Sequence, residues 1–340
     1  MKRYLFVALL AACPKSGDKP KPVEPAGRGD AQSRLLPEMD AGPLTLAPAP
    51  PLPAVPAGLP TPPAHPRVTP EALALGELLF YDTRLSQSGS RSCANCHDPA
   101  TGYSGNVQLA ADGKQNLRRT PALVNLAWAK EFGWDGRYGT FAEHLPPHLK
   151  GQLGDPLDAV TARIDAVPLY HLHLARIGGT PQDAIAQALE AFVLTRYEGD
   201  TPWDRMERTA LTKAGTASSD PIVAGYQLFV GKAQCGQCHP PPLYTDHGFH
   251  KVAPNPFGDK GKAGGFKTPT LRGAANRTSF FHAGSVKTLE DAVAQYQKPP
   301  ADVDPVLAKI KLTPDEAAQL VAFLKALTAD RPAPTKPVLP

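Results

Sequence analysis

Two short stretches of the 340-residue chain carry cysteine and histidine in the same order and spacing. Both read Cys-x-x-Cys-His, and together they use four of the five cysteines. In this pattern the two thiols add to the vinyl groups of a haem, and the histidine binds its iron. The two copies therefore predict two covalently bound c-type haems. The residues are Cys93, Cys96 and His97 for the first haem, and Cys235, Cys238 and His239 for the second.

Zinc sites, redox dithiols and disulfides also use paired cysteines. A zinc site could use four cysteines, but it does not require histidine directly after each pair. A thioredoxin-like dithiol needs a βαβ setting, and alternating strand patterns are scarce in this chain. Haem of the c type is attached outside the cytoplasm, which agrees with an export signal at the N-terminus.

The second axial ligand of each iron decides what the haem does. An iron closed on both faces carries electrons, whereas an open iron can bind peroxide or oxygen. Methionine is the usual second ligand in electron-carrying cytochromes c, but the chain has only Met1, Met39 and Met206. Only Met206 lies in the part that we expect to fold. At least one haem must therefore use another ligand or stay open.

The N-terminus resembles a lipoprotein export signal over residues 1–12. Lys2 and Arg3 precede a short apolar run, and Leu10-Ala11-Ala12-Cys13 resembles a lipobox, in which the cysteine becomes lipidated. The alternative is an ordinary signal peptide with a chance cysteine. Pro14 rather than aspartate follows Cys13, which favours the outer membrane over the inner. We expect a periplasmic protein that meets a membrane only through its lipid.

Residues 13–68 predict a disordered tether between that lipid and the folded part. Residues 14–68 contain 15 prolines, and such a composition cannot bury enough apolar surface to offset its conformational entropy. The net charge of +4 is mild, and lysine and arginine are scattered, so the sequence gives no indication of nucleic-acid binding.

Amphipathic helices lead into both haem motifs. A helix begins at Thr69-Pro70-Glu71, and Gly76-Glu77-Leu78-Leu79-Phe80 precedes the first motif. The similar sequence Gly225-Tyr226-Gln227-Leu228-Phe229 precedes the second, which indicates an internal repeat. Further helices are expected from about Pro181 and from the capping box at Thr313. The predicted fold is all-α, with two cytochrome c-like haem domains in tandem over residues 69–214 and 215–330, and a Pro-rich tail over 331–340.

The order of motifs resembles the bacterial dihaem cytochrome c peroxidase and MauG family over roughly residues 70–327. The matching segments are LLFYDTRLSQSGSRSCANCHDP, RRTPALVN, FGWDGR, LFVGKAQCGQCH, FKTPTLRG and FFHAGSVKTLEDAVAQY. The resemblance implies that the N-terminal haem is the peroxide site and that the C-terminal haem has two axial ligands. The second of these is methionine in the peroxidases and tyrosine in the MauG branch. The matching position is Tyr296, whose alternative role is a core aromatic on a helix face.

The resemblance also implies roles for several other residues. Residues 98–124 lack the histidine that closes the first iron in many of the peroxidases, so we expect that iron to be five-coordinate. Trp134 matches the tryptophan between the two haems, as an electron relay or as core packing. Arg137 and Arg272 could pair with haem propionates, or could form surface or interdomain ion pairs. His282 matches a family position and could be a hydrogen-bond donor near the haem.

Four positions depart from the family pattern. The family has glutamine and glutamate beside the open iron, where this chain has His144 and Gly154. Either His144, or Asp155 next to Gly154, could move the proton that peroxide cleavage requires, or the peroxidase chemistry is weakened. Each of these two residues could equally be a solvated loop residue. His148 and Gln152 are nearby. The family's calcium site has Arg119 and Arg277 here, which argues against a divalent cation, so bound calcium is doubtful.

Together these observations predict an oxidoreductase that reduces hydrogen peroxide. The electrons would come from a small c-type cytochrome or cupredoxin, or from a tryptophan or tyrosine of a protein substrate. The alternative is a non-enzymatic dihaem electron-transfer cytochrome, in which a side chain closes the first iron.

Overall fold

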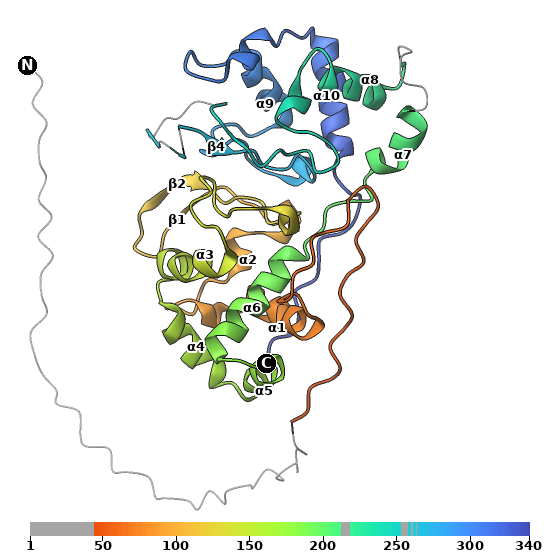
Figure 1. Ribbon diagram of the computed structural model, residues 1–340. Coiled ribbons are helices and arrows are strands. Elements are labelled where there is room, and N and C mark those ends of the chain that lie inside the picture. The colour runs from red at the N-terminus through yellow and green to blue at the C-terminus, as the bar shows by residue number, and fades with distance from the viewer. Residues whose placement is uncertain (1–43, 212–217, 253–257, 260, 263) are drawn as a thin grey trace, which may run out of the picture. The chain divides into compact units, whose positions relative to one another are not determined.

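The computed structural model describes residues 44–211, 218–252, 258–259, 261–262 and 264–340. Most of the regular structure is helical (Figure 1). The α-helices are α1 (Pro70–Tyr81), α2 (Cys93–Cys96), α3 (Phe141–His148), α4 (Leu157–Asp165), α5 (Pro168–Ile177), α6 (Pro181–Leu194), α7 (Pro202–Leu211), α8 (Pro221–Val230), α9 (Leu289–Tyr296) and α10 (Pro314–Ala326). The 3₁₀-helices are η1 (Thr83–Leu85), η2 (Pro99–Thr101), η3 (Leu126–Trp128), η5 (Cys235–Gln237), η6 (Ala274–Asn276) and η7 (Pro305–Lys309), and η4 (Leu149–Leu153) is a π-helix.

The N-terminal domain is built on the packing of α1 against α6. The side chain of Thr69 accepts a hydrogen bond from the Ala72 amide and caps α1, as predicted. A Cβ on Gly76 would lie 2.0 Å from the carbonyl oxygen of Ala188 in α6, so only glycine allows this close approach. Phe80 of α1 stacks on Phe192 of α6 with 4.4 Å between ring centres.

The C-terminal domain repeats this arrangement with α8 and α10. A Cβ on Gly225 would lie 2.0 Å from the carbonyl oxygen of Gln319, and Phe229 contacts Phe323 at 5.1 Å. The internal repeat read from the sequence is therefore confirmed as two equivalent helix pairs. Trp203 of α7 is fully buried in this second core, although α7 precedes the domain boundary that we predicted at residue 215. Trp203 packs at 5.0 Å on Phe323, so α7 contacts the second core although it precedes that boundary in the sequence.

Two short antiparallel strand pairs lie where the domains meet (Figure 1). In the N-terminal domain β1 (Val107–Leu109) pairs with β2 (Gln115–Arg119), with a register shift in β1. In the C-terminal domain β3 (Phe249–His250) pairs with β4 (Phe266–Lys267). The strands are short, so the helical fold class holds.

Residues 44–68 differ from the predicted disordered tether. They run in extended form along both domains (Figure 1). Arg176 donates to the Ala47 carbonyl at 2.7 Å, the Asp200 amide donates to the Ala57 carbonyl at 2.7 Å, and Arg272 donates to the Gly58 carbonyl at 2.8 Å. The proline-rich composition prevents self-burial but leaves carbonyls free to accept from a folded surface. The rest of the predicted tether and the predicted signal peptide lie outside the described residues.

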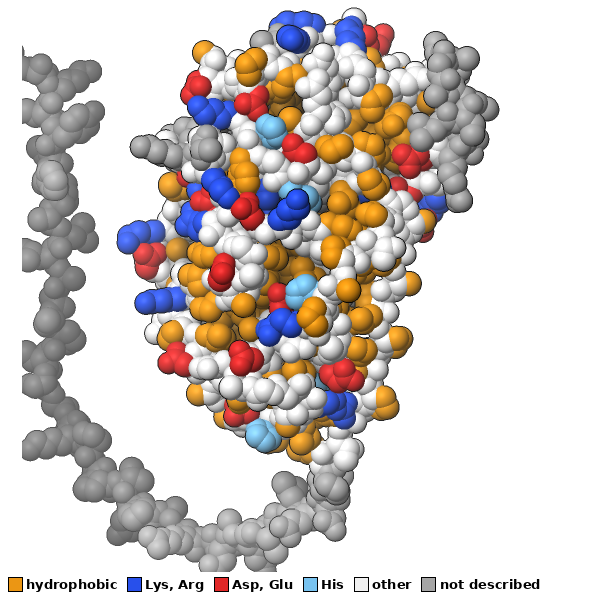
Figure 2. All heavy atoms as spheres, viewed as in Figure 1, with side chains coloured by type: hydrophobic (Ala, Val, Ile, Leu, Met, Phe, Trp, Pro, Cys, Tyr) orange, Lys and Arg blue, Asp and Glu red, His pale blue; other side chains and the backbone are white. Residues whose placement is uncertain are grey.

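The C-terminal tail returns over the N-terminal domain. Arg331 donates to the Tyr197 carbonyl at 2.5 Å, and Arg84 donates to the Pro340 carbonyl at 2.7 Å. Acidic and basic side chains are interspersed over the face drawn in Figure 2. Within the described residues no helix combines the length and the apolar character that crossing a membrane would need.

Candidate haem sites

The first Cys-x-x-Cys-His motif forms the short helix α2 and the residue after it. The Ser92 amide donates to the Asn95 side chain at 2.7 Å and fixes the start of α2. The Nδ1 atom of His97 lies 3.1 Å from the carbonyl oxygens of both Tyr103 and Pro121. A nitrogen between two carbonyls carries the proton, so Nε2 keeps the lone pair that a metal needs.

The second motif has the same arrangement in the other domain. The Nδ1 atom of His239 lies 3.0 Å from the Tyr244 carbonyl oxygen, which again leaves Nε2 available. All four motif cysteines are free thiols. Burial raises the pKa of Cys93 and of Cys235 to about 12, so neither is the exposed, low-pKa thiolate of a redox dithiol. The donor sets of both motifs fit c-type haem.

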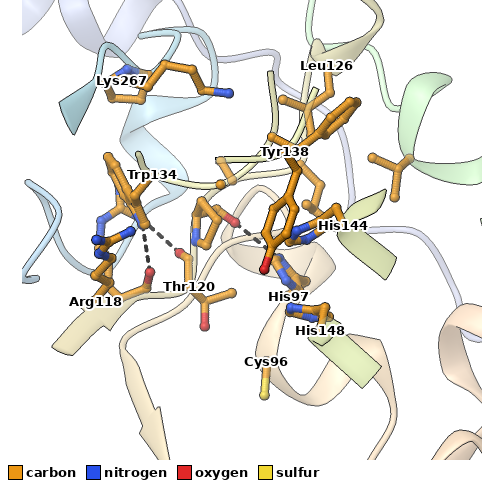
Figure 3. Close-up of a pocket in the computed structure, with 18 of the residues that line it drawn as sticks. Cys96, His97, Arg118, Thr120, Leu126, Trp134, Tyr138, His144, His148 and Lys267 are labelled. Atoms are coloured by element: carbon orange, nitrogen blue, oxygen red, sulfur yellow. Dashed lines mark hydrogen bonds between the residues drawn. The ribbon is translucent and has the colours of Figure 1, made fainter. Parts of the chain in front are cut away.

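A cavity of about 510 Å³ lies beside His97, which is within the usual range for a cofactor site. Figure 3 shows His97, His144 and His148 together at this cavity. His144 packs against Tyr138 at 5.0 Å between ring centres and against Phe132 at 6.4 Å. Aromatic and apolar side chains thus form much of the wall, as a haem requires. The cavity is also lined by Cys93, Cys96, Trp134, Phe141 and Gln152.

His144 is placed where the sequence predicted, and Asp155 is not. Burial, reinforced by His148 and His97, lowers the pKa of His144 to about 3, so its ring is neutral near neutral pH. Asp155 is buried outside the cavity, with its Oδ2 atom 2.7 Å from Nη2 of Arg163. The structure therefore does not bring Asp155 to the cavity that His144 lines. The π-helix η4 and the left-handed Gly154 separate Asp155 from α3, so Asp155 does not share a regular helix face with His144.

Trp134 lies at the contact between the two domains. Its Nε1–H donates to the Arg119 carbonyl oxygen at 2.9 Å, and its own carbonyl accepts from the Lys267 amide of β4 at 2.8 Å. The ring is buried and borders the cavity of His97. This position at the domain contact is what an electron relay needs, and it is also a packed core position.

A cluster of charged residues joins the domains next to Trp134. Arg118 contacts Asp135 of its own domain at 2.9 Å and forms a two-bond ion pair with Asp259 of the other domain. Arg137 also pairs with Asp135, at 2.5 Å, and its side chain is 55% exposed. The contacts of Arg137 match the ion pair that was the alternative to a propionate partner.

Arg272 was predicted either as a propionate partner or as part of an ion pair, and its contacts match the ion pair. The side chain is 1% exposed and forms two bonds of 2.8 Å with the Asp204 carboxylate. Its other donors reach the carbonyl oxygens of Pro242 at 2.7 Å and Gly58 at 2.8 Å. The guanidinium is thus occupied by protein groups that join α7, the C-terminal domain and the extended N-terminal segment.

Two other arginines are buried without a carboxylate partner among the residues that the structure describes. Arg119 is 2% exposed and donates to the carbonyls of Phe281 at 2.9 Å and Thr120 at 3.1 Å. Arg277 is 6% exposed, and its Nε is buried without an acceptor. Buried unpaired cations of this kind suit the propionates of a haem. From the sequence, both arginines served only as an argument against calcium. The adjacent Arg118 and Arg119 before Thr120 were nevertheless a visible signal of a basic site.

Tyr296 lies near the second motif, and His282 lies in the same domain, next to Phe266. Tyr296 ends α9, and burial raises its pKa, with a further contribution from Cys235 and Cys238, which places the phenol beside the motif thiols. His282 is buried and stacks on Phe266 with 3.6 Å between ring centres. Its Nε2 is buried without a partner among the described residues, so it remains free for a cofactor group.

Comparison with known proteins agrees with this geometry. The family model for di-haem cytochrome c peroxidase matches residues 70–211, and the model for cytochrome c matches residues 222–328. The chain is 34% identical to the methylamine utilization protein MauG of Methylorubrum extorquens, over 84% of this chain and 86% of that protein. It is 29% identical to the cytochrome c551 peroxidase of Nitrosomonas europaea, over 80% and 85% of the two chains. A crystal structure of a MauG-like protein associated with microbial copper homeostasis superposes with a TM-score of 0.71 at 25% identity, over 81% of this chain and 95% of that one.

Proposed function

Because the chain belongs to the di-haem cytochrome c peroxidase and MauG family, we propose that it reduces hydrogen peroxide at the haem held by His97. The second haem, held by His239, would pass electrons from an external donor. Two electrons and two protons convert one peroxide to two waters, and the haems supply the redox chemistry when bound. In this proposal the haems are attached through Cys93 and Cys96, and through Cys235 and Cys238.

The single observation that carries this proposal is the cavity beside His97. His144, which burial keeps neutral, lines this cavity together with His97 and would stand on the peroxide side of the haem. A neutral imidazole can take a proton from an incoming peroxide and return it to the departing oxygen. The apolar rings of Phe132 and Tyr138 beside it exclude water and hold the imidazole in place.

Trp134 and Tyr296 would connect this site to the donor. Trp134 lies at the domain contact and would act as the relay between the haems. Tyr296 would be the second ligand of the His239 haem; the pKa of its phenol is raised without a metal, so ionisation would require the iron. A phenolate is a hard anionic ligand that stabilises oxidised iron, where methionine would raise the reduction potential.

The tyrosine favours a protein substrate over a small redox carrier. An iron that is held in its oxidised form stores oxidising equivalents, which suits the oxidation of a tryptophan or tyrosine on a partner protein. A small cytochrome or cupredoxin is the other donor class. The relative with 34% identity is named as a methylamine utilization protein, MauG, and others are named as peroxidases.

Two further features belong to this proposal. We expect export and lipidation at Cys13, with a periplasmic location at the outer membrane, from residues 1–14 of the sequence. We also expect no calcium between the domains, because the guanidinium of Arg119 already binds the Phe281 and Thr120 carbonyl oxygens.

A second candidate function is a non-enzymatic electron carrier. It is favoured by one observation, the imidazole of His148 opposite His97, which could close the first iron. The two functions separate when the purified diferric protein is mixed with hydrogen peroxide in a stopped-flow spectrometer. The proposed enzyme should show a change of haem absorption within the first turnover, together with loss of peroxide. An unchanged spectrum would support the carrier.

A further inference from the structure

The cavity beside His97 contains a second histidine that the sequence analysis gave no role. His148 is the last residue of α3, one helical turn after His144, so both side chains project from the same face. The ring centres of His97 and His148 are 6.3 Å apart, with 49° between the ring planes. Figure 3 shows the two rings next to one another.

This separation matches two imidazoles that share one metal ion. A ligating nitrogen lies about 2 Å from its metal, and the centre of its ring lies about 1 Å further away. Two imidazoles on opposite sides of an ion therefore have ring centres about 6 Å apart. A proton acceptor that leaves room for peroxide would have to stand at least about 3 Å further from His97. The observed 6.3 Å is too short for that role.

We propose that His148 is the sixth ligand of the N-terminal haem iron in the resting protein. Within the described part of the chain, neither ring nitrogen of His148 makes a hydrogen bond, so either can bind the metal. By contrast, Nδ1 of His97 is held by two carbonyls, which fixes His97 as the permanent ligand. The resting iron is then six-coordinate, which replaces the five-coordinate iron expected from the sequence.

The backbone around His148 allows this ligand to leave. Pro146 and Pro147 lie inside α3 and cannot donate the backbone hydrogen bonds of a regular helix. The π-helix η4 follows directly and ends at Gly154 with φ of +95°. These features weaken the helical ladder on both sides of His148. If the proposed function is correct, His148 would have to leave the iron so that peroxide could bind there.

His144 then has a separate role. Its ring centre lies 5.0 Å from that of His148, and no ring contact joins it to His97 among the described residues. It stands back from the iron position, at the side of the ligand that would leave. The two histidines on one face of α3 therefore have different roles: His148 is the reversible ligand, and His144 is the proton acceptor.

The spin state of the exported diferric protein tests this assignment directly. Wild-type protein should show two low-spin haems by electron paramagnetic resonance, and His148→Ala should convert one of them to high spin. Added imidazole should restore the low-spin signal in His148→Ala. The matched variant His144→Ala, one turn away, should keep both haems low spin. Haem content per chain is measured for each protein, so that loss of cofactor is not mistaken for loss of a ligand.

A high-spin haem in the wild type, or two low-spin haems in His148→Ala, would overturn the assignment. The wild-type spectrum alone can do so if the variant fails to fold. Peroxide mixing separates this inference from the proposed function. If the closed form makes up 90–99% of molecules, freeing the iron should raise the second-order rate with peroxide by about 10- to 100-fold. Predicted spin states without any peroxide reaction would refute the proposed function and leave the ligand assignment intact.

Discussion

Removing the guanidinium of Arg272 should destabilise the protein while leaving the electronic properties of both haems unchanged. Arg272→Met keeps an apolar stem of similar length but leaves the carboxylate of Asp204 without its partner. That carboxylate is 0% exposed, so water cannot replace the lost bonds. The carbonyl oxygens of Gly58 and Pro242 also lose their donor.

The size of the effect follows from burial. Removing one member of a buried ion pair costs about 3–5 kcal/mol, since the other charge stays buried and unpaired. The free energy of unfolding of a domain is typically about 5–15 kcal/mol, so this single change should remove about a fifth or more of the stability. Asp204→Asn in the Arg272→Met background removes the stranded charge. The coupling energy of this double-mutant cycle should be about 1–3 kcal/mol.

Urea unfolding followed by circular dichroism measures these free energies, and spectroelectrochemistry gives the haem reduction potentials. A propionate partner would behave in the opposite way, because its loss would shift a haem potential and cost little stability. The structural assignment of Arg272 is refuted if Arg272→Met changes the free energy of unfolding by less than about 0.5 kcal/mol, the range of an ordinary surface substitution. A shifted haem potential would then restore the propionate role.

Three further predictions concern the second haem, calcium and acid stability. Tyr296→Phe should convert the low-spin signal of the His239 haem to high spin, and an unchanged signal would mean that the phenol is not a ligand. Treatment with a calcium chelator should leave the spectra and the thermal midpoint unchanged, because Arg119 is a fixed cation at the domain contact. Hydrogen bonds from Arg137 and Arg118 outweigh burial and lower the pKa of Asp135 to about 2. An unfolded aspartate titrates near about 3.9, so this stabilisation is complete above that pH and is lost as the pH falls towards 2. Circular dichroism during acid titration should show the loss in that window, and a transition near pH 6 would contradict it.

The haem motifs and the helices that precede them could be predicted because their signals are local. The capping threonine of α1, Thr69, and the capping box of α10 at Thr313 both appear as expected. The repeat also depended on local sequence, since Gly76 and Gly225 begin the two similar stretches. In each of these cases a few neighbouring residues determine the structure.

The ion pairs of Asp155 and Arg272 could not be predicted from the sequence, because they depend on register and on distant partners. Counting residues from Trp134 to find the proton-transfer group assumes a regular helix. The π-helix η4 breaks that regularity before Asp155. The partner of Arg272 lies 68 residues earlier in the chain, at Asp204, and no local pattern reveals it. His148 was passed over because its distance from His97 exists only in three dimensions.

The prediction of a disordered tether differs from the structure at residues 44–68 for another reason. Its composition reports that the segment cannot form a core of its own. It does not report that Arg176, Arg272 and the Asp200 amide present donors along a surface where the segment's carbonyls can bind. The prediction of disorder therefore used the composition of the segment but not the donors on the surface that binds it.

The matching glycine crossings, Gly76 on Ala188 and Gly225 on Gln319, mean that the two domains carry their Cys-x-x-Cys-His motifs on the same helix-pair scaffold. A difference in chemistry between the two haem sites must therefore arise outside these helix pairs. Segments outside the helix pairs, such as α3 beside His97 and α9 with Tyr296, are where the two sites can differ.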